Sequence, residues 1–368
     1  MTSHWIDNSE ALDALLLRHR GAPTVAVDTE FRRRDTFYPQ IALVQLCWDE
    51  EAYLLDPLSL SNTASLEGLL SDPTVIKLIH SASEDLEVFS RWLGRLPSPL
   101  FDTQRAAALV GMGASLSYRA LVAAFFDIEL PKDETQSDWL QRPLSSTQMT
   151  YAAQDVTYLL PAGVTLLDRS RALGRLDWVL EDGARMLPGG KPPIGKFKSA
   201  YKLSVDQQRA LIAVVEWREH EARKLDRPRS WILQDKLVSA VARALPETVQ
   251  ELASVSDVPN GLVRRSGETL VTQIQRAIAD SALDLSQISP PPLPGSARSL
   301  SASLAERTST IAQEHDIAQE VLMAKADLEY LIRQLSDPLL PDLPAWSGWR
   351  QALAVQPLKA WLHEARPQ

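Results

Sequence analysis

Cysteine is almost absent from this 368-residue chain, and the single one, Cys47, excludes a disulfide within the chain. It lies in the apolar run Ile-Ala-Leu-Val-Gln-Leu-Cys-Trp, so we expect a small buried core residue. A zinc site built from several cysteines is excluded for the same reason. No apolar stretch approaches the roughly 18 residues that span a bilayer, so no membrane association is expected. The first residues lack a basic region followed by an apolar core, so no signal peptide is expected and the predicted location is cytoplasmic.

Basic residues are too few to balance the acidic ones, and the formal net charge is −9. The imbalance is concentrated in residues 1–165, which hold 22 Asp or Glu against 12 Lys or Arg. A site for divalent cations needs local negative charge. Tight, nonspecific coating of nucleic acid needs the opposite sign. The charge distribution therefore favours a cation-binding site in the first part of the chain.

Strand-like and helix-like segments alternate in the first half of the chain. Apolar and β-branched content predicts strands at 24–30, 40–48, 51–56 and 75–80. The short link Asp49-Glu50 predicts a hairpin between the second and third of them. Helical spacing predicts helices at 83–93, with Ser83 as N-cap, at 117–126 and at 146–167. This order predicts an α/β domain with a mixed sheet.

Two segments rich in proline divide the rest of the chain, which has a helical pattern that begins near Ser204 or Asp206. Several residue types recur 90 positions apart, including Asp226 and Asp316, so we expect a duplicated helical unit. The predicted organisation is a first domain at 1–185, a linker at 186–203, a helical domain at 204–285, a proline-rich linker at 286–300 and a second helical domain at 301–368.

Four carboxylates and one phenol are the candidates for chemistry. Asp28 and Glu30 stand at i and i+2 near the end of a predicted strand, so both face the same side of the sheet. Asp85 lies in the first turn of a predicted helix, and Tyr151 and Asp155 are i and i+4 neighbours on another. Taken singly, each is better explained by a solvated strand end, a helix dipole or chance. Taken together, they form an all-oxygen set that suits Mg²⁺ or Mn²⁺.

The order of these residues, with their neighbours, resembles the DEDD exonuclease superfamily in its tyrosine branch, and within it the ribonuclease D family. The resemblance rests on Asp28-Thr-Glu-Phe-Arg, Tyr38-Pro-Gln-Ile-Ala-Leu-Val-Gln45-Leu, His80-Ser-Ala-Ser-Glu-Asp85-Leu, Ser137-Asp-Trp-Leu-Gln-Arg142-Pro-Leu and Tyr151-Ala-Ala-Gln-Asp155-Val. The helical part at 205–285 looks like a helicase-and-ribonuclease-D C-terminal (HRDC) domain. The last segment resembles a divergent second copy of it.

The resemblance implies a ribonuclease H-like exonuclease domain followed by small helical bundles. It implies a metal-dependent 3′–5′ exoribonuclease that releases nucleoside 5′-monophosphates from single-stranded RNA 3′ ends, with tRNA precursors as expected substrates and no obligate protein partner. Two divalent ions, Mg²⁺ or Mn²⁺, would bind Asp28, Glu30, Asp85 and Asp155. Tyr151 would orient the attacking water, because a phenol with a pKa near 10 is a poor base at neutral pH.

Substrate contacts are expected from residues near these motifs. The candidates are Thr29, Phe31, Gln45, His80, Lys132 and Arg142. Core packing is an equal alternative for Phe31, Gln45 and His80, and Trp139 is expected to be a core anchor. The arginines at 32–34 are expected to be a solvated surface or a phosphate guide.

The helical region also interleaves basic and aromatic residues, a pattern that suits either auxiliary RNA binding or a charged helix face over an aromatic core. The residues are Arg223, Lys224, Arg227, Arg229, Trp217 and Trp231. Two other functions remain open at this point. One is a DNA 3′–5′ exonuclease with the same metal centre, and the other is a non-catalytic nucleic-acid-binding protein.

Overall fold

The computed structural model describes residues 2–130, 137–189 and 192–364. The chain divides into two compact units, which are described separately. Unit 1 combines Met1–Arg32, Ile41–Gly189 and Leu293–Gln368, and unit 2 combines Arg33–Gln40 and Gly190–Pro292. The C-terminal helices therefore share a compact unit with the first half of the chain.

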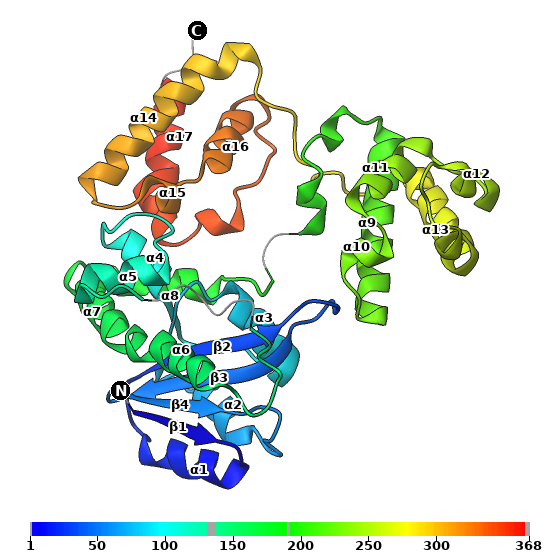
Figure 1. Ribbon diagram of the computed structural model, residues 1–368. Helices are drawn as coiled ribbons and strands as arrows, with labels where there is room; N and C mark the ends of the chain where they lie inside the picture. The colour runs from blue at the N-terminus through cyan, green and yellow to red at the C-terminus, as the bar shows by residue number, and fades with distance from the viewer. Residues whose placement is uncertain (1, 131–136, 190–191, 365–368) are drawn as a thin grey trace. The chain divides into compact units, whose positions relative to one another are not determined.

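Unit 1 contains a six-stranded mixed sheet (Figure 1). Its strands are β1 (Thr2–Ile6), β2 (Thr24–Arg32), β3 (Gln40–Trp48), β4 (Glu51–Leu55), β5 (Ile76–Ile79) and β6 (Leu100–Asp102), in the order β1-β4-β3-β2-β5-β6. Strand β1 is parallel to β4, β3 is antiparallel to β4, and β5 is parallel to both β2 and β6. The predicted α/β class with a mixed sheet is confirmed. Strands β1 and β6, at 2–6 and 100–102, were not predicted.

The predicted hairpin between β3 and β4 is confirmed. Asp49 and Glu50 form its turn with φ angles of 47° and 67°. Two consecutive positive φ angles are what a two-residue hairpin turn needs to match the twist of its strands. The hairpin places β3 at the centre of the sheet beside β2, where Asp28 and Glu30 lie.

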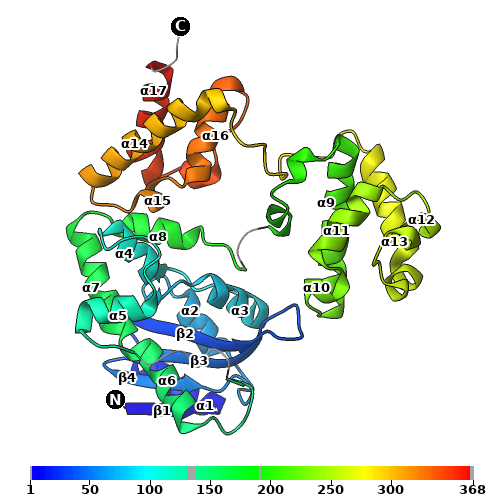
Figure 2. The same cartoon turned by 45° about the horizontal axis from the view of Figure 1, so that its top comes forward.

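Helices cover both faces of the sheet, as Figures 1 and 2 show. One face is covered by α1 (Ser9–Arg18), α2 (Ala64–Ser71) and α3 (Ser83–Leu93), and the other by α6 (Ser146–Thr157) and α7 (Leu159–Ala172). Leu12, Leu66 and Phe89 pack against Val27 on the first face. On the second face, Ala153, Val156 and Leu159 pack against Ala26 and Cys47. Cys47 is fully buried, as predicted.

Two helix predictions need correction. The single helix predicted at 146–167 is two helices, which meet at Tyr158. Pro161 follows closely, and because proline has no N–H it cannot continue the hydrogen-bond ladder to the carbonyl of Thr157. The N-cap of α3 is Ala82, and Ser83 is its first helical residue. Helix α5 (Tyr118–Phe126) begins after Ser117, whose side chain accepts from the backbone N–H of Ala120.

Unit 2 is a helical bundle with its own apolar core. Its helices are α9 (Val205–Leu225), α10 (Arg229–Ile232), α11 (Asp235–Ala244), α12 (Val249–Ser254) and α13 (Asn260–Ala279). The predicted cap at Ser204 is confirmed as a reciprocal capping box with Gln207. Two short 3-10 helices lie within the predicted linker 186–203, and their Ile194 and Ala200 pack into the core of unit 2.

The helices α14 (Arg298–Glu314), α15 (Gln319–Leu322) and α16 (Lys325–Ser336) repeat the pattern of α9 to α11. Helices α10 and α15 begin at Arg229 and Gln319, and α11 and α16 begin at Asp235 and Lys325, each pair 90 positions apart. Asp226 and Asp316, also 90 apart, both take positive φ angles of 47° and 46°. This agreement supports the duplication, and we retain the second HRDC-like domain as a proposal. Helix α14 starts inside the predicted linker 286–300.

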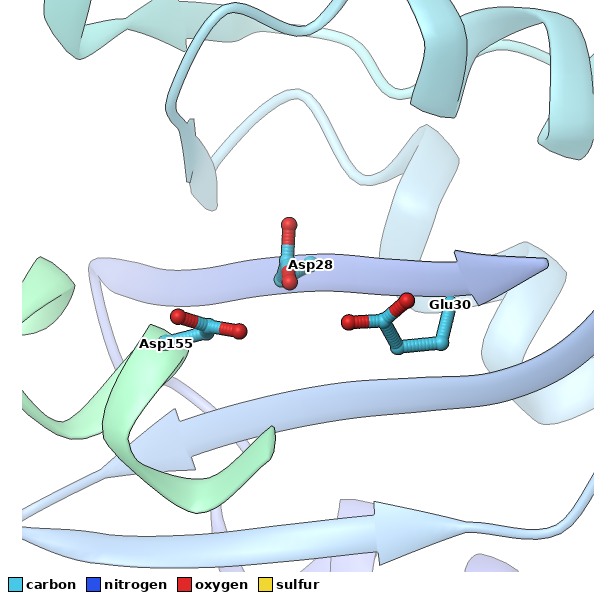
Figure 3. Close-up of side chains that lie close together, drawn as sticks. All are labelled: Asp28, Glu30 and Asp155. Carbon is cyan, nitrogen blue, oxygen red and sulfur yellow. The ribbon is translucent and has the colours of Figure 1, made fainter. Parts of the chain in front are cut away.

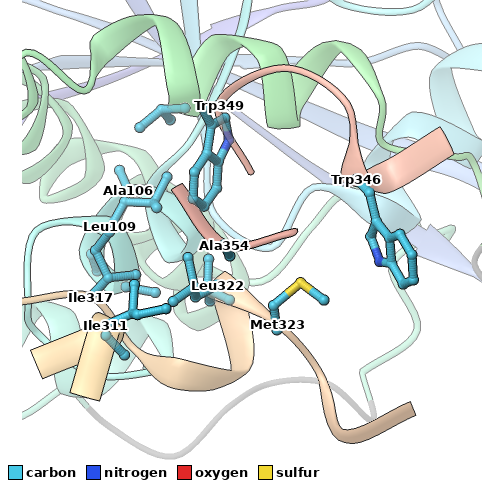
Figure 4. Close-up of a cluster of buried hydrophobic side chains, with 14 of the residues drawn as sticks. Ala106, Leu109, Ile311, Ile317, Leu322, Met323, Trp346, Trp349 and Ala354 are labelled. Carbon is cyan, nitrogen blue, oxygen red and sulfur yellow. The ribbon is translucent and has the colours of Figure 1, made fainter. Parts of the chain in front are cut away.

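The C-terminal helices share a core with the helices at the edge of the sheet (Figure 4). Ile311, Leu322 and Trp349 pack with Ala106 and Leu109 of α4 (Thr103–Leu109). Figures 1 and 2 both show α15 beside α4. The backbone N–H of Ala318 donates to the carbonyl of Ala108 over 3.1 Å.

Arg175 and Asp316 join these two parts of unit 1. The Arg175 guanidinium donates to the carbonyls of Leu109 (2.6 Å) and His315. Gly111, with a φ of +85°, lies so close to the carboxylate of Asp316 that a Cβ there would clash with it. The turn after α14 therefore packs closely against the loop after α4.

A buried ion pair fastens the end of the chain to α8 (Leu176–Ala184). The Asp182 carboxylate accepts hydrogen bonds from both terminal nitrogens of Arg350, at 2.5 and 2.6 Å, and from the indole N–H of Trp349 at 3.2 Å. The Trp349 ring stacks on Trp178 with ring centroids 4.8 Å apart. Bidentate pairing of this kind is geometrically specific, so it fixes the register between the two segments.

Within the described ranges, none of the helices combines the length and apolar character needed to cross a membrane.

Replacing Asp182 with alanine should strongly destabilise unit 1. The side chains of Arg350 and Asp182 are only 12% and 5% exposed, so the substitution leaves a guanidinium buried without its counter-ion. We expect the free energy of unfolding to fall by about 3–5 kcal/mol, measured by urea denaturation. The control is Asp168→Ala, which removes an exposed pair with Arg171 and should cost less than about 1 kcal/mol. Equal losses in the two variants would contradict the assignment.

Candidate active site

A cavity of about 340 Å³ opens where β2, α3, α5 and α6 meet in unit 1. Eight of the predicted site residues line it: Asp28, Thr29, Glu30, Phe31, His80, Asp85, Tyr151 and Asp155. They come from three distant stretches of the sequence. The cavity therefore collects all five residues predicted to carry the chemistry.

Three of the predicted carboxylates converge in this cavity. Oxygens of Asp28, Glu30 and Asp155 lie within 4.8 Å of one another. Figure 3 shows Asp28 and Glu30 projecting from β2, and the carboxylates of Glu30 and Asp155 pointing toward each other. The sheet explains the first pair, because residues i and i+2 share a face. The packing of α6 on that face supplies Asp155.

The electrostatics of the cavity disfavour a cluster of bare charges. Burial, and then the nearby Asp155 carboxylate, hold the pKa of Asp28 well above its usual range. Burial, and then Asp28, do the same to the pKa of Asp85. Like charges in a poorly solvated place favour the protonated acids unless a cation is present. Carboxylate oxygens are hard donors, so a cluster of carboxylates that repel one another suits a hard divalent cation.

Asp85 lies in the same cavity but is not one of the three converging carboxylates. It is 7% exposed, and its Oδ1 accepts a 2.5 Å hydrogen bond from the hydroxyl of Thr29. Thr29 alternates with Asp28 and Glu30 on β2, so its side chain leaves the strand on the α3 side. Thr29 was predicted to contact substrate, and in the structure it holds Asp85.

Tyr151 lies on α6 one turn before Asp155, as predicted. Its ring packs against Trp139, with ring centroids 5.9 Å apart. Trp139 is 2% exposed and packs with Ala42, Leu43 and Leu54, so its prediction as a core anchor is confirmed. Helix α6 itself begins with a capping box between Ser145 and Gln148, which fixes its first turn.

His80 lines the cavity, but protein groups engage both of its ring nitrogens. Nδ1 lies 2.9 Å from the hydroxyl of Thr103, and Nε2 lies 3.1 Å from the carbonyl of Leu116. Burial lowers the pKa of His80, so the neutral ring is favoured. A neutral ring that donates from Nε2 to Leu116 and accepts at Nδ1 satisfies both contacts. His80 therefore braces the wall of the cavity.

Two predicted substrate contacts lie outside the cavity. Gln45 is fully buried in β3 and does not line it. Arg142 forms a bidentate pair with Asp56 at 2.7 and 2.9 Å and donates to the carbonyl of Ala42. Its guanidinium is thus committed to holding the segment before α6 on the sheet. Lys132 lies outside the residues that the structure describes.

The sequence analysis missed residues from α5 and from within the last motif. Tyr118, Arg119 and Gln154 all line the cavity. The Tyr118 hydroxyl donates to the carbonyl of Gln154 over 2.8 Å, which ties α5 to α6 directly before Asp155. Burial and the neighbouring Asp155 raise the pKa of Tyr118 well above its ordinary value. Gln154 lies within the motif Tyr151-Ala-Ala-Gln-Asp155. The spacing of residues 117–119, by contrast, gives no signal that they belong to the site.

The chain matches two family models. Residues 3–167 match a family described as a 3′-5′ exonuclease, and residues 207–274 match the HRDC domain. The first match covers all five residues predicted to carry the chemistry. The second covers most of unit 2 and agrees with the resemblance noted from the sequence.

Similarity to curated relatives and solved structures extends over the whole chain. Ribonuclease D of Pseudomonas paraeruginosa is 37% identical over 98% of each chain. Ribonuclease D of Escherichia coli is 31% identical over 99% of each chain. The crystal structure of Escherichia coli RNase D, described as an exoribonuclease involved in structured RNA processing, aligns over 100% of both chains with a TM-score of 0.83.

These similarities set aside the alternatives of a DNA exonuclease and of a non-catalytic binding protein. Identity above 30% over nearly the full length of several relatives is combined here with a cavity that holds all five residues predicted to carry the chemistry. The chain belongs to the ribonuclease D family and is a 3′–5′ exoribonuclease.

Proposed function

We propose that the cavity holds two divalent metal ions, Mg²⁺ or Mn²⁺, and cleaves the last phosphodiester bond of an RNA 3′ end to release a nucleoside 5′-monophosphate. The observation that carries the proposal is the convergence of Asp28, Glu30 and Asp155 within 4.8 Å. Asp85, buried in the same cavity, completes the ligand set. When bound, such ions activate water and stabilise the leaving oxygen of an in-line displacement.

The protein's own residues have separate tasks in this mechanism. The four carboxylates would hold the ions, and Asp28, Glu30 and Asp155 form the converging part of this set, as Figure 3 shows. The Tyr151 hydroxyl would orient the attacking water by a hydrogen bond. Thr29 would fix the rotamer of Asp85 before metal arrives, because it holds that carboxylate at 2.5 Å. Supporting contacts of this kind tune metal sites strongly.

Contacts to the RNA would come from other residues of the cavity. Phe31 is partly exposed there and could stack on the terminal base. Arg119 is exposed at the cavity and takes the place of Arg142 as the cation for the terminal phosphate. Discrimination against DNA rests on contacts to the 2′-hydroxyl.

The substrate we propose is the single-stranded 3′ end of a structured RNA, with tRNA precursors as the main candidates. The Escherichia coli relative is described as an enzyme of structured RNA processing, and this chain aligns with it over its full length. This substrate would place the enzyme in the cytoplasm, where tRNA is matured.

Labelled RNA tests both polarity and metal dependence. With Mg²⁺, a 3′-labelled single strand should lose its label as mononucleotide at once, whereas a 5′-labelled strand should shorten stepwise. Chelator should stop both reactions. Asp155→Asn should reduce turnover to near background, and Asp168→Asn, an exposed acid on α7, should not change it. Normal turnover by Asp155→Asn, or digestion in chelator, would sink the metal mechanism. A matched DNA oligomer measures the RNA preference.

Tyr151→Phe should lower kcat by about 10²–10⁴-fold, the usual range for a positioned group that handles protons. The ring that packs on Trp139 is retained, so stability and metal affinity should stay unchanged. Single-turnover cleavage and thermal unfolding report the two effects separately. The matched control is Tyr158→Phe, at the end of the same helix, which does not line the cavity. A wild-type kcat in Tyr151→Phe would remove the hydroxyl from the mechanism.

Thr29→Val should raise the Mg²⁺ concentration needed for half-maximal activity by about 10–100-fold. The substitution keeps the shape of the side chain but removes the hydrogen bond to Asp85. Thr29→Ser keeps the hydroxyl and should behave like the wild type. If the valine and serine variants require the same Mg²⁺ concentration, Thr29 does not position the ligand.

A further inference from the structure

We propose that two of the metal ligands, Asp85 and Asp155, are set in place by four residues that are not ligands themselves. These residues form one hydrogen-bonded set, here called the support network, which consists of Asp102, Thr103, His80 and Tyr118. They are positioning residues, because each acts on a ligand through another group. The proposal rests on the metal mechanism proposed above and deepens it.

The first branch of the support network holds the start of α3, the helix that carries Asp85. The carboxylate of Asp102 accepts from the backbone N–H of Ala82, the N-cap of α3, over 2.9 Å. Its other oxygen accepts from the backbone N–H of Arg105 in α4 over 3.0 Å. In a capping box, the acceptor for the N-cap N–H comes from the same helix. Here it comes from the end of β6, so one carboxylate fixes α3 against α4.

Burial makes this branch restrictive. Asp102 is 1% exposed and Ala82 is fully buried. A shift of α3 would leave the N–H of Ala82 buried without an acceptor, which costs more than the bond itself contributes. Ser81, directly before Ala82, has a positive φ of 58°. A backbone conformation of this kind persists only where its surroundings over-determine it. Asp102 therefore limits where α3 can begin.

The second branch starts at the next residue, Thr103, and leads to α5. The Thr103 hydroxyl lies 2.9 Å from Nδ1 of His80, whose Nε2 lies 3.1 Å from the carbonyl of Leu116. Gln104 donates to the same carbonyl over 3.0 Å. Leu116 precedes Ser117, the N-cap of α5. The first residues of α4 thereby hold the start of α5.

Tyr118 extends the second branch from α5 to α6. Its hydroxyl donates to the carbonyl of Gln154 over 2.8 Å, and its ring lies 5.6 Å from that of His80 between centroids. The helical bond to the same carbonyl, from the N–H of Tyr158, is long at 3.5 Å. Tyr118 therefore supplies the shorter of the two contacts on the residue directly before Asp155.

The two branches begin at adjacent residues and end at ligands in different helices. Asp102 reaches Asp85 through α3, and Thr103 reaches Asp155 through α5 and α6. A common origin fixes the separation of two carboxylates that would otherwise move apart, because like charges repel. Outer contacts that orient metal ligands change metal affinity strongly. A merely structural network would lower stability and leave the affinity of the folded protein for metal unchanged.

Binding of Mn²⁺ to the full chain without RNA tests the second branch, with the spectrum of free Mn²⁺ in electron paramagnetic resonance as the readout. Tyr118→Phe keeps the ring and removes the hydroxyl. It should raise the Kd for Mn²⁺ about tenfold to a hundredfold. The matched control is Tyr330→Phe, which removes a hydroxyl that donates to the carbonyl of Pro341 over 3.1 Å. The control should stay within about twofold of the wild type.

Thr103→Val tests whether the effect passes along the branch. Thr103 does not line the cavity, so a change in Mn²⁺ affinity must be transmitted through His80. The Kd should rise about threefold to tenfold, less than for a closer partner of a ligand. Thr103→Ser keeps the hydroxyl and should bind like the wild type. The matched control is Thr308→Val, which removes another fully buried hydroxyl, bonded to the carbonyl of Leu304 at 2.7 Å.

Asp102→Asn tests the first branch. The amide keeps one oxygen, so only one of the two backbone N–H groups retains its acceptor. The Kd for Mn²⁺ should rise about tenfold. Asp72→Asn makes the same change of charge and also removes an acceptor of a backbone N–H, that of Thr74 at 2.8 Å, and should bind like the wild type. Wild-type affinity in Asp102→Asn removes α3 from the proposal.

Thermal unfolding of every variant separates positioning from stability. Wild-type affinity in both Tyr118→Phe and Thr103→Val overturns the proposal. Equal losses of affinity in the variants and their matched controls also overturn it, because the effect would then follow stability. In either case Asp155→Asn should still abolish Mn²⁺ binding, and the metal mechanism would stand. A wild-type protein that binds no Mn²⁺ would overturn that mechanism and this proposal together.

Discussion

Mutual repulsion between carboxylates is the constraint on which unit 1 depends. Asp28, Glu30 and Asp155 lie within 4.8 Å of one another, and burial holds the pKa of Asp28 high. Such an arrangement persists only where the scaffold over-determines it. Strand β2 fixes the first two acids in the sheet, and the packed face of α6 fixes the third. The Tyr118 bond to the Gln154 carbonyl then anchors α6 directly at the site.

The two helical parts of the chain after residue 189 have different structural roles. The C-terminal helices share a core with α4 and α8 and are fastened by the buried pair of Asp182 and Arg350, so they belong to the body that carries the catalytic cavity. The bundle at 190–292 has its own core, and the segment after β2 is held on it by hydrogen bonds from Phe37 and Tyr38 to Asp226. Asp226 and Asp316, at equivalent positions of the proposed repeat, each lie against a loop that comes from the exonuclease sequence.

Negative charge gathers at the catalytic cavity of unit 1. The acidic cavity needs cations before it can accept a phosphodiester. A moderate number of basic contacts suits an enzyme that must release its RNA, since each phosphate contact adds affinity and salt dependence. The net charge of −9 therefore reflects the location of the acids and does not argue against RNA as substrate.

The sequence by itself determined the chemistry and the local elements. The i, i+2 spacing of Asp28 and Glu30, the i, i+4 spacing of Tyr151 and Asp155, the β3–β4 hairpin and the offset of 90 are all short-range or periodic patterns. Only the tertiary structure decided which partners meet. Arg142 pairs with Asp56, and Thr29 donates a hydrogen bond to Asp85. Tyr118 lines the cavity although its helix carries no predicted motif. Such pairings join residues tens of positions apart, and packing selects them in ways that spacing cannot encode.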